Sequence, residues 1–122
     1  MIICKNNNVS AYIHEEGFIY YTPKEFDYKS SDNNAHITTG YIDRNVYKIN
    51  PLTIGDLYRY INTRGYNSDT LRNNIINLFK NLINALRIPI CNSKKLNKGT
   101  AFQLFGCDVA PDNKLGVKLI EI

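Results

Sequence analysis

Two carboxylates in segment 102–122 are the side chains of this sequence best placed to do chemistry. Asp108 and Glu121 each stand alone in an apolar run, and the turn-forming sequence PDNK separates the two runs. Val, Ile, Leu and Phe on both sides favour strands, so the segment predicts an antiparallel β-hairpin. Mg²⁺ in proteins is commonly held by one or two carboxylates together with nucleotide phosphates. The two acids are therefore a candidate metal site.

The register of this hairpin decides whether the two acids meet. With a loop at 112–115, residue 119 lies opposite Asp108, and Asp108 and Glu121 share a face about 7 Å apart along the strand. With a loop at 112–113 the separation rises to about 13 Å, which is too far for one ion.

The expected surroundings of the acids also favour a cation. The shared face would carry three apolar side chains, Leu104, Val117 and Leu119. Carboxylates on an apolar face are unfavourable unless an opposite charge compensates them. The alternative is that Glu121 frays while Asp108 forms a local cap or salt bridge.

Three separated motifs resemble the tubulin-tyrosine ligase family, a branch of the ATP-grasp ligases. The hairpin segment FQLFGCDVAPDNKLGVKLIEI is similar to the last core hairpin of that family. Upstream, YIHEEGFIYYTPKEF and then AHITTGYIDR resemble its strand with a Glu-Gly turn and its His-hydrophobic-Thr motif. A long helix lies between these motifs and the hairpin, in the family's order. The resemblance covers nearly the whole chain.

The resemblance implies ATP-dependent attachment of an amino acid, tyrosine or glutamate, to a protein carboxylate such as a tubulin tail. ATP first phosphorylates that carboxylate, and the incoming amine then displaces phosphate. By position, Asp108 and Glu121 match the family's Mg²⁺-binding acids, and Thr38 matches a threonine near the phosphates and the acceptor. The cofactors implied are ATP and Mg²⁺, and the partners are an acidic protein tail and an amino acid.

Several positions depart from the family pattern. Thr39 stands where an Asn is usual, and Arg44 where a Lys is usual. The Arg expected after the Glu-Gly turn is replaced by Tyr20 or Tyr21, and a tyrosine cannot supply a bidentate positive charge. An Asn expected two positions beyond Glu121 has no counterpart.

The resemblance includes only the C-terminal portion of the family's domain, without the half that carries the adenine pocket. We therefore expect residues 1–122 to be a single partial domain, a fragment or degenerate member that is inactive alone. The alternative is a non-catalytic basic module that binds an acidic polypeptide. Weaker candidates for contacting an acidic tail are Arg44, Lys94 and Lys95.

The composition fits a small domain with modest positive charge. The chain has 122 residues, is 43% hydrophobic and carries a net charge of +4, which is enough for one core. Positive charge favours acidic partners without choosing among them. We expect no nucleic-acid binding, because basic and aromatic residues do not cluster on one predicted face.

Cellular location is inferred from what the sequence lacks. No run of about 18 apolar residues predicts a membrane helix, and the first residues do not resemble a signal peptide. Cys4, Cys91 and Cys107 form no CxxC or Cys/His pattern, so we interpret them as reduced thiols. These features predict a cytoplasmic protein without membrane partners.

The remaining elements must position the site. Residue types predict strands at 2–4, 10–14 and 18–22, an exposed loop at 24–34 and an extended segment at 35–42. The spacing of apolar residues predicts a short helix at 52–62, capped by Thr53. His36, two residues before Thr38, is expected to hold its loop by hydrogen bonding.

The strongest periodic signal predicts a long helix at 69–88. Asn67 or Ser68 caps its start, and Pro89 is expected to end it. Its opposite face is expected to be solvated and carries four asparagines, Asn73, Asn77, Asn81 and Asn84. The fold class predicted is α/β (α+β): an antiparallel sheet covered by one long helix, as in the C-terminal part of an ATP-grasp domain.

Overall fold

The structure is a computed structural model and describes residues 1–6, 8–38, 44–91 and 99–122, with the side chain of Cys91 excluded. These residues form two compact units. The first unit comprises Met1–His14 and Asn67–Ile122, and the second comprises Glu15–Tyr66. The predicted class is confirmed, since the described residues form antiparallel sheets and two α-helices. The single partial domain remains a prediction.

A three-stranded antiparallel sheet lies in the first unit. Its strands are β1 (Ile2–Lys5), β2 (Asn8–Ala11) and β3 (Thr100–Gln103), in the order β2-β1-β3. Ile2 and Cys4 are buried, whereas Lys5 is exposed, as the alternation of side chains along a strand requires. The strand at 100–103 thus pairs with β1 and is not part of the C-terminal hairpin.

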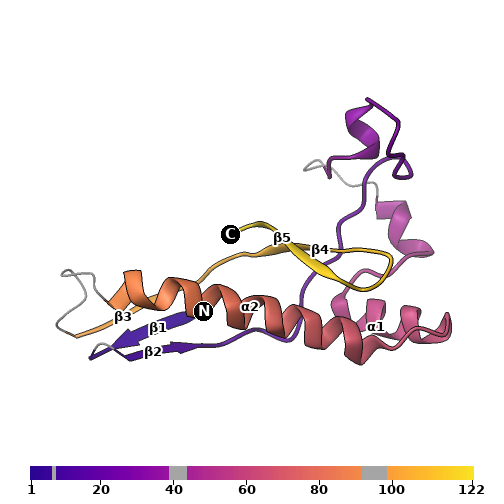
Figure 1. Cartoon of the computed structure of the whole chain (residues 1–122). Coiled ribbons are helices and arrows are strands. Elements are labelled where there is room, and N and C mark those ends of the chain that lie inside the picture. Colours follow the sequence, from indigo (N-terminus) through magenta and orange to yellow (C-terminus); the bar gives the residue numbers. More distant parts are fainter. Residues whose placement is uncertain (7, 39–43, 92–98) are drawn as a thin grey trace. The chain divides into compact units, whose positions relative to one another are not determined.

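The long helix α2 (Ser68–Cys91) lies along this sheet and the hairpin (Figure 1) and contacts β2. The Oδ1 of Asn67 accepts a hydrogen bond from the Asp69 amide at 2.8 Å, so the predicted cap is confirmed. Leu71 is fully buried, and the four asparagines of the predicted solvated face are exposed. The predicted end was wrong, because Pro89 lies inside the helix.

The hairpin consists of β4 (Asp108–Pro111) and β5 (Val117–Glu121), and β5 contacts α2. The side-chain amide of Asn74 in α2 donates a hydrogen bond of 2.8 Å to the Leu115 carbonyl in the hairpin turn. This hydrogen bond ties the hairpin turn to the long helix. The first strand of the hairpin begins at Asp108 and is shorter than the sequence predicted.

The second unit is built around α1 (Ile54–Thr63). Thr53 and Asp56 form a reciprocal capping box at its start, which confirms the predicted cap. Tyr21 donates a hydrogen bond to the Pro51 carbonyl at 2.9 Å, and its ring packs edge-on against Tyr47 at 5.9 Å. These contacts anchor the segment before α1.

Two predictions in this unit were wrong or lie outside the description. Residues 18–22 do not form a strand, because the described segment makes only an isolated bridge between Phe18 and Thr53. Short 3-10 helices form at Asn33–Ala35 and Arg44–Lys48. The segment predicted as extended at 35–42 begins at the end of the first of these, and its residues 39–42 lie outside the described chain. Neither α-helix of the described residues combines the length and hydropathy needed to cross a bilayer.

Candidate functional site

The hairpin turn at 112–116 sets the register of the two strands that carry the candidate site. Asp112 accepts hydrogen bonds through Oδ1 from the amides of Lys114 and Gly116, both at 2.8 Å. Leu115 has a φ of 63°, a left-handed conformation. A Cβ at Gly116 would lie 2.6 Å from Asp112 Oδ2, so a side chain there would displace the carboxylate that holds the turn. The turn closes with the Pro111 and Val117 pair.

This turn gives a register different from the one predicted. Val109 pairs with Leu119, whereas the loop at 112–115 would have put Asp108 there. The ladder then shifts between Asp108 and Val109, and Asp108 is the partner of Glu121. The structure therefore brings the two predicted acids together as direct cross-strand partners, with Ile120 as the extra residue of a β-bulge.

The predicted apolar surroundings of the acids are wrong. Val117 and Leu119 are half-buried on the face opposite to Asp108, while Asp108 and Glu121 are exposed. Leu104 is 72% exposed and lies outside both strands of the hairpin. The physical reason is that a one-residue change of register moves a side chain to the other face of the ribbon. Burial therefore supplies no reason for a cation here.

The argument for a cation rests instead on the pairing of two oxygen donors. Among the described residues, neither the Asp108 nor the Glu121 carboxylate accepts a hydrogen bond or forms an ion pair. The same residues include no group of three or more acidic, histidine or cysteine side chains able to hold a metal. Two cross-strand carboxylates fit an Mg²⁺ site in which phosphate and water supply the other ligands, because Mg²⁺ needs few protein ligands.

The other predicted site residues are exposed or lie outside the description. Thr38 is exposed, and Arg44 is exposed at the start of a 3-10 helix; both belong to the second unit. Lys94 and Lys95 lie outside the described residues, as does Thr39.

The two tyrosines expected in place of an arginine, Tyr20 and Tyr21, have different environments. Tyr20 is 58% exposed. Burial raises the pKa of Tyr21 to about 12, with further contributions from Tyr47 and Tyr60. Because the hydroxyl of Tyr21 already donates to the Pro51 carbonyl, this side chain serves the fold of the second unit.

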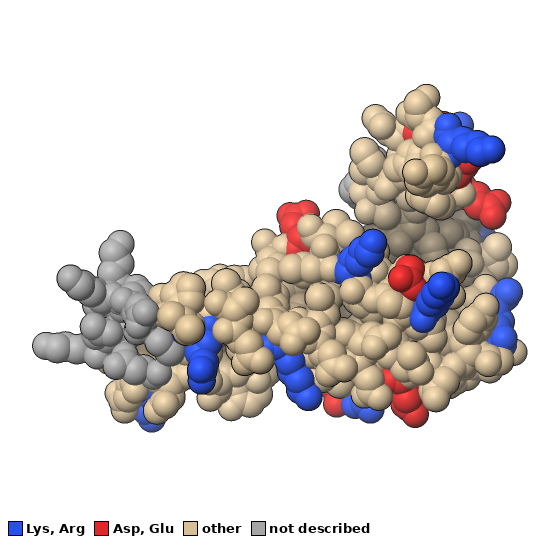
Figure 2. Space-filling model, viewed as in Figure 1, with Lys and Arg blue, Asp and Glu red and all other residues tan. Residues whose placement is uncertain are grey.

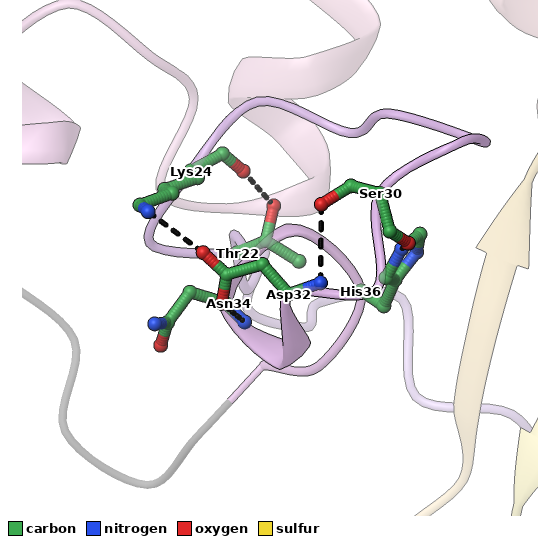
Figure 3. A network of polar contacts seen from close by, with 6 residues as sticks. All are labelled: Thr22, Lys24, Ser30, Asp32, Asn34 and His36. Atoms are coloured by element: carbon green, nitrogen blue, oxygen red, sulfur yellow. Dashed lines mark hydrogen bonds and ion pairs between the residues drawn. The ribbon is translucent and has the colours of Figure 1, made fainter.

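The loop before Thr38 is held by its own polar side chains (Figure 3). Lys24 forms a salt bridge with Asp32 at 2.7 Å, and Asp32 accepts a hydrogen bond from the Asn34 amide. His36 Nε2 lies 2.7 Å from the Ser30 carbonyl. The expected role of His36, holding the loop by hydrogen bonding, agrees with this contact.

The second unit contains a hollow of about 320 Å³ that no sequence motif predicted. Tyr47 and Tyr60 line it together with the carboxylate of Asp56. That carboxylate accepts hydrogen bonds from Thr53 and pairs with Arg59, so the start of α1 already uses it. The hollow therefore offers less for a ligand than the unpartnered acids of the hairpin.

Comparison with known proteins adds one finding. No curated protein and no solved structure matches the chain. A family model described as "Tubulin-tyrosine ligase family" matches residues 1–122, the whole chain. The resemblance inferred from the motifs is thereby confirmed, and the chain belongs to the tubulin-tyrosine ligase family.

Proposed function

We propose that this chain contributes the metal-binding carboxylates of an ATP-dependent ligase that attaches tyrosine or glutamate to a protein carboxylate such as a tubulin tail. Membership of the family supports the class of reaction. The pairing of Asp108 with Glu121 across the hairpin is the observation that carries the proposal. The surrounding architecture would correspond to the C-terminal part of an ATP-grasp domain.

In this proposal the two acids hold Mg²⁺ between the strands. Cross-strand partners have Cβ atoms about 4.5–5.5 Å apart, so both carboxylates reach an ion at about 2 Å. When bound, Mg²⁺ offsets the negative charge of the ATP phosphates during phosphoryl transfer. The hydroxyl of Thr38 would donate a hydrogen bond to phosphate or acceptor. Arg44, Lys94 and Lys95 would contact an acidic tail.

We further propose that the two acids alone do not suffice for turnover. Both are exposed and have no described partner that orients them, so water competes strongly for the ion. The reaction would also need groups that fix adenine and the γ-phosphate. A cytoplasmic location is supported by the free thiols of Cys4, which is buried, and Cys107.

Calorimetric titration of the full chain with Mg-ATP tests the proposed site. We expect saturable heat that requires Mg²⁺ and falls more than about tenfold in affinity in Asp108→Ala and in Glu121→Ala. Glu25→Ala is the matched control, because Glu25 is an exposed carboxylate outside the hairpin. Equal binding by all the variants would contradict the proposal.

A basic module for acidic polypeptides is the second candidate, favoured by the net charge of +4. Figure 2, however, shows Lys and Arg interspersed with Asp and Glu on the visible face. Titration with a glutamate-rich peptide separates the two functions. Salt-sensitive peptide binding without any heat from Mg-ATP would favour the module over the ligase.

A further inference from the structure

We propose that the β-bulge at Ile120 is the device that positions Glu121 opposite Asp108. This inference rests on the proposed metal role of the two acids and assigns a positioning role to a residue that bears no ligand atom. The observation behind it is the shift of the strand ladder, which is regular up to the Val109 and Leu119 pair and irregular beyond it.

Counting along the ladder shows what the bulge changes. Pro111 pairs with Val117, and Val109 pairs with Leu119. A regular continuation would put Ile120 opposite Asp108. Glu121 would then point to the other face of the ribbon, because successive side chains alternate. One extra residue in β5 restores the pairing of the two acids, as a bulge sets two residues against one.

The rest of the hairpin cannot supply this adjustment by sliding. The turn is held by the hydrogen bonds that Asp112 Oδ1 accepts from the Lys114 and Gly116 amides. The half-buried side chains of Val117 and Leu119 would become exposed if the register slipped by one residue. Ile120 is 66% exposed, so the extra residue is accommodated where no packing is lost. The position of Glu121 therefore depends on the bulge.

Deletion of Ile120 tests the inference on the full chain, with Mn²⁺ alone as the probe and its electron paramagnetic resonance signal as the readout. The shortened β5 forms a regular ladder in which the glutamate again faces Asp108. We expect the natural chain and the deletion variant to bind Mn²⁺ within about threefold of each other. Asp108→Asn should bind at least about tenfold more weakly than either.

The other outcomes overturn the inference in distinguishable ways. Binding about tenfold tighter in the deletion variant would mean that the natural ladder is regular, which overturns the bulge but leaves the metal role of the acids standing. No binding by either chain above the level of Asp108→Asn would overturn both. Loss of binding on deletion, in a chain that still folds, would show that facing carboxylates are insufficient.

Nuclear Overhauser contacts give a measurement that is independent of metal and of any variant. We expect cross-strand contacts between Asp108 and Glu121 in the natural chain, together with those between Val109 and Leu119. Cross-strand contacts of Asp108 with Ile120 and none with Glu121 would overturn the inference directly.

Discussion

The loop at 22–36 and the bulged end of the hairpin use carboxylates in opposite ways. In the loop, Asp32 pairs with Lys24 and accepts a hydrogen bond from the Asn34 amide. In the hairpin, neither the Asp108 nor the Glu121 carboxylate has a hydrogen-bond or ion-pair partner among the described residues. A salt bridge and a hydrogen bond make the Asp32 carboxylate part of the fold, whereas the carboxylates of Asp108 and Glu121 remain available to a ligand.

The same contrast separates acids that are close in sequence. Asp112 lies four residues after Asp108 and accepts two backbone hydrogen bonds in the turn. The carboxylate of Asp56 has the same structural role at the start of α1, where it accepts a hydrogen bond from the Thr53 amide. A carboxylate in this chain is thus better judged as a ligand by whether the fold already uses it than by its exposure. Mutations of the two kinds of acid and their partners should differ in the property they change.

The largest loss of stability is expected from Gly116→Ala. The added Cβ would lie 2.6 Å from Asp112 Oδ2 and would force the turn to change. We expect the free energy of unfolding to fall by about 1–3 kcal/mol in urea denaturation. Gly106→Ala is the matched control, because no atom lies within 4 Å of a Cβ built there. Equal losses in the two variants would show that the turn is not the cause.

A smaller loss is expected when the cap of α1 is removed. Thr53→Ala deletes the hydroxyl that accepts a hydrogen bond from the Asp56 amide at 3.1 Å. Loss of such a cap typically lowers the free energy of unfolding by about 1 kcal/mol. Thr70→Ala, an exposed threonine in the first turn of α2, should change it by less than about 0.5 kcal/mol. A Thr53→Ala protein as stable as this control would refute the importance of the cap.

The structural acids should also give the stability of the chain a dependence on acid pH. Hydrogen bonds from Thr53 lower the pKa of Asp56 from 3.8, and the hydrogen bond from Lys24 lowers the pKa of Asp32. Their stabilisation is therefore present above the unfolded pKa and is lost as the pH falls through the folded pKa.

Urea denaturation at a series of pH values, from about 5 to about 2.5, measures this dependence. Asp56→Asn should make the free energy of unfolding less dependent on pH across this range. Asp32→Asn should independently remove the part of the pH dependence that comes from Asp32. An unchanged slope in both variants would be inconsistent with a structural role for these carboxylates.

The smallest effect on stability is expected at the candidate site itself. Asp108→Asn and Glu121→Gln keep the shape of exposed side chains that lack described partners. The free energy of unfolding should stay within about 0.5 kcal/mol of the natural value, although we expect cation binding to weaken. A loss of unfolding free energy as large as that of Thr53→Ala would show that Asp108 and Glu121 stabilise the fold. The two acids would then not differ from Asp32 and Asp56.

Local signals allowed the helices to be predicted better than the strands. The caps at Thr53 and at Asn67, the latter one of two predicted candidates, each depend on residues within four positions, and both are confirmed. Pro89 lacks the amide hydrogen that would bond to the Ala85 carbonyl, yet α2 continues past it to Cys91. A local pattern thus locates a helix start more reliably than its end.

Strand pairing was less predictable, because it depends on residues distant in sequence. The aromatic and β-branched residues at 18–22 favour a strand, yet the described chain offers them no ladder partner beyond one bridge. In the hairpin, the acids were found from their isolation in apolar runs, but the register and the reason for their pairing were wrong. Nothing in the residue type of Ile120 indicates a bulge, since its conformation follows from the ladder around it.

The bond between Asn74 and the Leu115 carbonyl restrains the hairpin at its turn, whereas the two acids lie at the opposite end of the ribbon. An ion bound by both acids would hold the ends of β4 and β5 together. Ion binding would then make the ends of the strands more ordered, so the amides near Asp108 and Glu121 should exchange hydrogen more slowly when the ion is bound.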